Sequence, residues 1–159
     1  MNWIIRSTKI VKYHTNLHEI LKPIWEDLNK YNWLLTDLDF ISDVELPINF
    51  DHDCFILDSK EFEIIYNSEV QIIWGIISAI PKNCKFNVDL LGKLSSEDNK
   101  IWQPDQFLIS ESFLEIVAFD SGYTILKFTD KKLSDKFKNH FGKEVLSLEK
   151  FNQKIPYEN

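Results

Sequence analysis

The alternation of apolar and polar residues divides the chain into segments with the periods of strands and helices. Residues 2–13 are rich in β-branched and aromatic side chains, which predicts an opening strand. After Thr15, a candidate helix N-cap, apolar residues recur at intervals of three and four, which predicts an amphipathic helix to about Tyr31. Pro23 lies inside this pattern and should kink or restart the helix, because proline removes a backbone hydrogen bond.

The next stretch predicts two strands and a helix. Strict alternation over residues 32–41 places two sets of side chains on opposite faces of a strand: Leu34, Thr36, Leu38 and Phe40 on one, and Leu35, Asp37, Asp39 and Ile41 on the other. The short apolar run over residues 54–57 (CFIL) predicts a buried strand. Asp58 and Glu61 have the spacing of a capping box, which predicts a helix over residues 59–67.

The apolar run over residues 70–80 predicts a central strand covered on both faces, with Gly75 marking a bulge or a close approach. It is followed by residues 82–109, which have little periodicity and predict at most a short strand. That short strand would cover residues 86–91, and residues 95–100 predict a polar turn.

Residues 113–119 and 123–129 flank a three-residue connection that contains Gly122, which predicts a β-hairpin. Asp130 then caps a helix to about Phe141, and the following glycine stops it.

These elements predict an α+β fold with a mainly antiparallel sheet of about five to six strands and about three helices. With 159 residues and 44% hydrophobic content, the chain is expected to form a single domain over residues 1–159, with a frayed tail over roughly 150–159.

Charge is distributed unevenly along the chain. Residues 31–59, which we call the acidic segment, contain no Lys or Arg and seven carboxylates: Asp37, Asp39, Asp43, Glu45, Asp51, Asp53 and Asp58. The whole chain has a formal net charge of −7, so this segment accounts for the entire acidic excess. Such a balance argues against a general nucleic-acid binder, which needs many cations to neutralise phosphates.

The chain is expected to act in the cytoplasm, without a membrane partner. Its longest apolar run is too short to span a bilayer, and its start lacks the apolar region of a signal peptide. Cys54 and Cys84 lie in no metal or redox spacing and are expected to be reduced.

Neither catalytic residues nor a cofactor can be assigned from motifs. Asp37 and Asp39 form a DxD pair, but two residues carry little information, and no glycine-rich phosphate loop accompanies them. The alternative is a metal-dependent enzyme or ligand-binding protein that uses Asp and His side chains. His14, His18 and His52 are the candidate ligands, since two histidines four residues apart can share a helix face.

The acidic segment also interleaves carboxylates with large apolar residues, a combination that suits a basic protein partner. We therefore predict a partner-binding surface formed by Asp37, Asp39, Asp43, Glu45, Asp51, Asp53, Phe40 and Phe50.

The chain resembles small bacterial proteins of the polymorphic-toxin immunity type in four stretches. These are WLLTDLDF, CFILDS with the helix after it, IIWGIISAI and FLEIVAFDSGYTILKFTDKKLSDKFKNHF. The resemblance covers mainly the last third of the chain. It implies a cytoplasmic, non-enzymatic protein that neutralises a toxin by covering it, often a nuclease with a basic cleft. The family supplies no catalytic residues to carry over.

Overall fold

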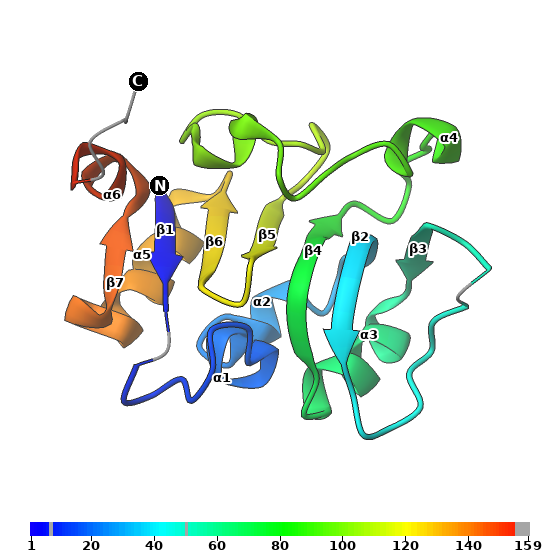
Figure 1. Cartoon of the computed structure of the whole chain (residues 1–159), viewed down its shortest axis with the longest axis horizontal. Helices are drawn as coiled ribbons and strands as arrows, with labels where there is room; N and C mark the ends of the chain where they lie inside the picture. The colour runs from blue at the N-terminus through cyan, green and yellow to red at the C-terminus, as the bar shows by residue number, and fades with distance from the viewer. Residues whose placement is uncertain (7, 50, 155–159) are drawn as a thin grey trace.

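The computed structural model describes residues 1–6, 8–49 and 51–154, and seven strands of these residues form one antiparallel sheet (Figure 1). In chain order the strands are β1 (Asn2–Ile5), β2 (Asn32–Ile41), β3 (Cys54–Leu57), β4 (Gln71–Ile80), β5 (Leu114–Phe119), β6 (Tyr123–Phe128) and β7 (Val145–Ser147). Across the sheet the order is β3-β2-β4-β5-β6-β1-β7. The predicted α+β class is confirmed, with more strands and more helices than expected. β3 is predicted to be buried, but it lies at the edge of the sheet with Ile56 exposed.

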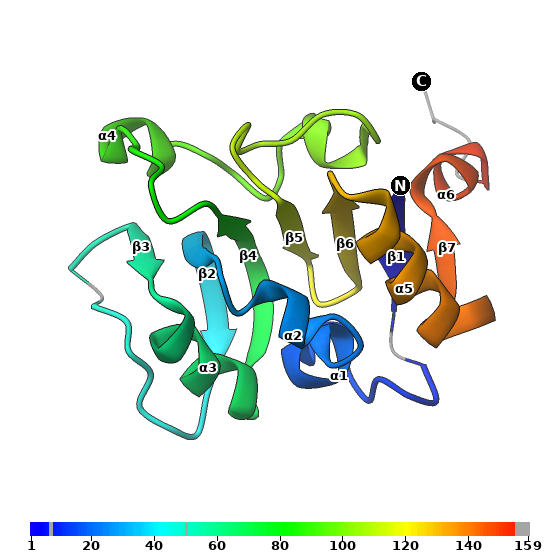
Figure 2. The ribbon, with the colours of Figure 1, turned by 180° about the vertical axis from the view of Figure 1, so that it is seen from behind.

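One face of the sheet packs against four helices (Figure 2). They are α1 (Leu17–Leu21), α2 (Trp25–Leu28), α3 (Ser59–Asn67) and α5 (Lys131–Phe141). Their apolar sides and alternate strand residues form the largest core cluster, in which Trp33, Phe62 and Phe137 are fully buried. This face carries the helices that the periodicity predicts.

The opposite face is covered by the chain between β4 and β5 and by the C-terminal helix. The covering elements are α4 (Val88–Leu91), the 3-10 helix η1 (Asn99–Trp102) and α6 (Leu148–Lys154), and a second 3-10 helix, η2 (Gly142–Glu144), precedes β7. The short strand predicted over residues 86–91 is wrong, because α4 occupies this position. Ile101 and Leu148 form one apolar cluster with this face, and Leu91 and Ile109 form another. β4 is therefore covered on both sides, as predicted.

Local signals fix several element ends where the sequence places them. The Asp58 carboxylate accepts hydrogen bonds from the backbone N–H groups of Lys60 and Glu61, and the Glu61 side chain accepts one from the Asp58 N–H. This is the predicted capping box. The Asp130 side chain caps α5, and Gly142 ends it with φ of 55°.

The N-terminal region differs from expectation at two points. β1 ends at Ile5. The cap of α1 is Asn16, whose side chain accepts from Glu19 N–H, whereas Thr15 is buried and exchanges hydrogen bonds with the backbone of Ile72. The helix restarts after Pro23, one of the two outcomes that proline predicts.

The predicted faces of β2 are wrong because of a bulge. The register with β4 shifts between Thr36 and Asp39, and Asp37 adopts φ of 54°. Leu38 and Phe40 therefore pack against the helix-side core, while the Thr36 hydroxyl bonds to Leu91 O on the opposite side.

Two remaining expectations concern the membrane and the tail. No helix in the described part of the chain is long and apolar enough to cross a bilayer. Of the predicted tail, residues 150–154 belong to α6, and residues 155–159 lie outside the described residues.

Candidate functional site

A pocket of about 570 Å³ lies beside β2, where β3 stops pairing with it. The last β2–β3 pair is Thr36 with Cys54, yet β2 continues to Ile41 before the loop that leads back to β3. We call this hollow the acidic pocket. Its lining is Asp37, Leu38, Asp39, Phe40, Ile48, His52, Asp53, Phe55, Trp74, Gly92, Ser96 and Glu97.

Carboxylates from three segments line the pocket. Asp37 and Asp39 come from β2, Asp53 from the end of the loop before β3, and Glu97 from the loop after α4. The described lining residues include neither Lys nor Arg. A hollow lined by one sign of charge concentrates its potential and attracts cations.

Aromatic rings form part of the same lining. Phe40, Phe55 and Trp74 are only half-buried, although Phe40 and Phe55 also touch the helix-side core. Trp74 contacts Phe119 edge-on, with ring centroids 4.8 Å apart. The pocket therefore offers apolar surface as well as negative charge.

Asp37 differs in role from the other carboxylates. Its Oδ2 accepts hydrogen bonds from both the backbone N–H and the hydroxyl of buried Ser96, each at 2.6 Å. Aspartate is among the few residues that tolerate a positive φ, so it can hold the bulge and reach this loop at once. Asp37 thus joins β2 to the opposite wall of the pocket.

The structure brings together only some of the predicted partner-binding residues. Asp37, Asp39, Asp53 and Phe40 line the pocket. Asp43, Glu45 and Asp51 are exposed on the adjoining loop without lining it, and Phe50 lies outside the described residues. Sequence reasoning missed Trp74, Phe55 and Glu97, because strand pairing and the long β4–β5 connection place them there.

The three histidines of the alternative metal site do not assemble. His14 is buried and its Nε2 lies 3.1 Å from Ile72 O, His18 stacks on Tyr66 at 4.6 Å, and His52 lines the acidic pocket. Burial also lowers the pKa of His14. Within the described residues, His, Cys, Asp and Glu side chains form no group of three or more that could hold a metal ion.

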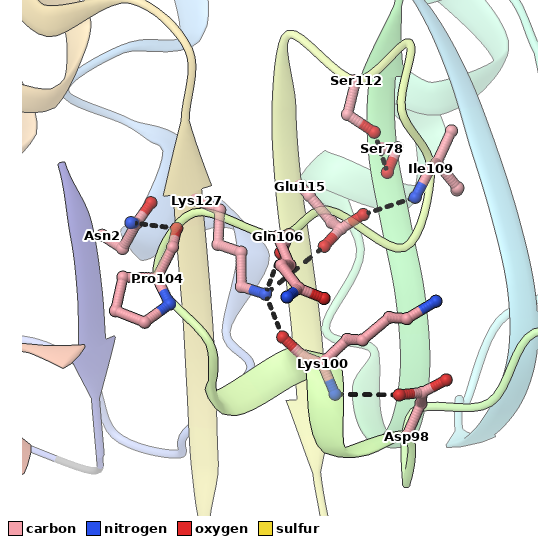
Figure 3. Close-up of polar contacts among 10 residues, drawn as sticks. All are labelled: Asn2, Ser78, Asp98, Lys100, Pro104, Gln106, Ile109, Ser112, Glu115 and Lys127. Atoms are coloured by element: carbon pink, nitrogen blue, oxygen red, sulfur yellow. Dashed lines mark hydrogen bonds and ion pairs between the residues drawn. The ribbon is translucent and has the colours of Figure 1, made fainter. Parts of the chain in front are cut away.

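A second polar arrangement lies buried on the side of the sheet opposite the helices (Figure 3). Asn2, Lys127, Glu115 and Ser78 are register neighbours on β1, β6, β5 and β4, and we call them the polar row. Each reaches the overlying chain of residues 99–112, which we call the cover segment.

Lys127 and Glu115 make the central contacts of the polar row. Lys127 Nζ donates to Lys100 O at 2.8 Å and to Gln106 O at 2.5 Å. Glu115 Oε2 accepts from Ile109 N–H at 2.9 Å, while its Oε1 lies 4.0 Å from Lys127 Nζ. Burial raises the pKa of Glu115 to about 7 and lowers that of Lys127.

The two ends of the polar row complete the attachment of the cover segment. The Asn2 amide donates to Pro104 O, and the Ser112 hydroxyl donates to Ser78 at 3.0 Å. The row therefore fixes a long irregular segment: Asn2, Lys127 and Glu115 form hydrogen bonds with its backbone, and Ser78 forms one with the Ser112 hydroxyl. A hairpin centred on Ser121 pairs positions 115 and 127, so the sequence contained a signal for this ion pair.

Comparisons of the chain with protein-family models, with curated proteins and with solved structures find no match. The function is therefore inferred from the site itself.

Proposed function

We propose that this protein is a non-enzymatic binding protein of the cytoplasm that covers a basic surface of a bacterial toxin, as immunity proteins do. The acidic pocket and the loop beside it are the contact surface. The observation that carries the proposal is the gathering of Asp39, Asp53 and Glu97 around one hollow whose described lining contains no balancing cation.

Charge on this surface suits fast association with a cationic protein. Complementary potentials raise the encounter rate and disfavour partners of the wrong sign. Asp43, Glu45 and Asp51 extend the negative surface along the exposed loop between β2 and β3. The same surface should repel nucleic acid.

Exposed apolar side chains accompany the acids. Ile41 is 59% exposed at the end of β2, Val44 is 52% exposed in the following loop, and Ile56 is 46% exposed on β3. Large apolar groups beside charged ones are typical of protein interfaces, where burial supplies affinity and charge supplies selectivity. This supports a protein partner over a small ion.

The test is binding to the toxin domain encoded by the neighbouring gene, measured by calorimetry at low and at physiological salt. Charge reversal at Asp39, Asp43 and Asp53 should weaken binding by about tenfold or more. A control variant with Glu63, Glu69 and Glu149 reversed has the same net charge, and these exposed residues lie outside the pocket lining. Equal loss in both variants, or no binding by the wild type, contradicts the proposal.

A further inference from the structure

We propose that the acidic pocket binds an arginine side chain of the partner, with the guanidinium among the pocket carboxylates and against its aromatic rings. This inference rests on the proposed function, which it makes specific. It predicts both the chemical group that enters the pocket and the residue type at the centre of the partner surface.

Three carboxylates of the pocket other than Asp37 come from separate parts of the chain. Asp39, Asp53 and Glu97 lie on three different segments of the chain. The ion pairs of the described residues join Lys127 to Glu115, Lys131 to Asp135 and Lys136 to Asp27, and none involves these pocket carboxylates. A guanidinium has five N–H donors spread in one plane, so it can bond to carboxylates on several sides at once.

The apolar part of the lining is an independent indication of a ligand. Phe55 and Trp74 line the hollow and are only half-buried, whereas Trp33 and Phe62 in the adjacent core are fully buried. A planar cation can lie against such rings and gain both contact area and a cation–π interaction. The volume of about 570 Å³ falls in the usual range of ligand pockets, roughly 300–1,000 Å³.

Two adjacent residues of β2 hold the walls of the pocket in place. The Thr36 hydroxyl lies 3.1 Å from both Asp53 O and Leu91 O and donates its single proton to one of them at a time. The strand pairing of Thr36 with Cys54 also holds the end of the loop before β3. Asp37 ties the next loop through Ser96. All three carboxylate-bearing segments are therefore attached at one point of β2, and a preorganised site loses less entropy on binding.

Lysine fits this site less well than arginine. Its ammonium is a compact and strongly hydrated point charge, so entry into a partly apolar hollow would remove bound water. In return it would form fewer directed hydrogen bonds than a guanidinium. The guanidinium is more weakly hydrated and flat. We therefore expect a preference for arginine of about two- to fivefold, from its weaker hydration and its larger number of directed hydrogen bonds.

The experiment compares two blocked tripeptides, Gly-Arg-Gly and Gly-Lys-Gly, titrated into the ¹⁵N-labelled full chain. The arginine peptide should shift the Trp74 indole and Gly92 amide signals in a saturable way and bind at least about twofold more tightly than the lysine peptide. Asp39→Asn and Asp53→Asn should each weaken arginine binding several-fold. Asp105→Asn, at an exposed site outside the pocket lining, is the control and should not change it.

Three results overturn the inference: equal affinity for the two peptides, shifts that spread over the surface without saturating, or equal effects of the pocket and control variants. Other results separate failure of the arginine pocket from failure of the proposed function. Toxin binding that depends on Asp43 and Glu45 but survives Asp39→Asn and Asp53→Asn would support the function and reject the arginine pocket. Saturable arginine binding by a chain that binds no toxin domain would support the arginine pocket and reject the proposed function.

Discussion

Replacing Lys127 by Met tests whether the polar row fixes the cover segment. Methionine keeps most of the side-chain length but removes the ammonium that donates to Lys100 O and Gln106 O. Lys100 O keeps a hydrogen bond from the Gln103 N–H, so only Gln106 O loses its donor, and a carbonyl left without a donor costs about 1–3 kcal/mol. Relief of the desolvation of Lys127 offsets part of this cost, so we expect a loss of roughly 1–2 kcal/mol in the free energy of unfolding at pH 5.

The loss should grow as the pH rises, because Glu115 then lacks its cation. In the wild type the Glu115 pKa rises from 4.5 to about 7 on folding. A carboxyl of this kind contributes stability that is fully present below pH 4.5 and is lost as the pH rises through 7, about 3 kcal/mol in total. Without Lys127 the folded-state pKa rises further, so the difference between variant and wild type should widen by about 1 kcal/mol at pH 8.

Urea unfolding followed by tryptophan fluorescence at pH 5 and pH 8 measures both effects. Lys131→Met is the control, because Lys131 forms an exposed pair with Asp135 and should change stability by less than about 1 kcal/mol. Glu115→Gln should remove most of the stability change between pH 4.5 and 7. If Lys127→Met matches the wild type at both pH values, or if the difference narrows toward pH 8, the reasoning is refuted.

Three further substitutions test local features by thermal unfolding. An added Cβ at Gly75 would lie 2.6 Å from Leu38 Cδ2, so the Leu38 side chain must move, and Gly75→Ala should cost about 1 kcal/mol. An unchanged melting temperature would mean that the Leu38 side chain adopts another position without cost. Above pH 3.8, Asp58→Ala should lower the melting temperature by roughly 2–4 °C, because it removes the helix cap. Backbone hydrogen bonds depress the pKa of Asp58, so the difference between variant and wild type should disappear as the pH falls below 3.8. Asp37→Ala should cost about 1.5–3 kcal/mol by removing the charge-assisted bonds to Ser96, whereas Asp39→Ala should be nearly neutral.

Elements with local signals were predictable from the sequence. The capping box fixes the start of α3, and Asp130 with Gly142 bounds α5. The two strands around Gly122 pair as expected because the connection is short. In these cases the determining contacts lie within a few residues of one another.

Features that depend on distant contacts were not predictable. The β2 pattern of Leu34, Thr36, Leu38 and Phe40 resembles an uninterrupted strand, and only the bonds between Asp37 and Ser96 show why it bulges. The acidic excess was visible in the sequence, but its gathering with Glu97 and Trp74 required the path of the β4–β5 connection. The acidic segment could therefore be predicted from the sequence, whereas the pocket depends on tertiary contacts.

The position of β1 has a consequence for biosynthesis. This strand leaves the ribosome before the other described strands, yet it pairs with β6 and β7, the last two of them in chain order. β1 cannot pair until β6 has emerged, and pairing on its second edge needs β7 as well, whereas β4, β5 and β6 can form a sheet with one another as each appears. Insertion of β1 should therefore be a late and slow step of folding, since such long-range pairings carry a large loop-closure entropy.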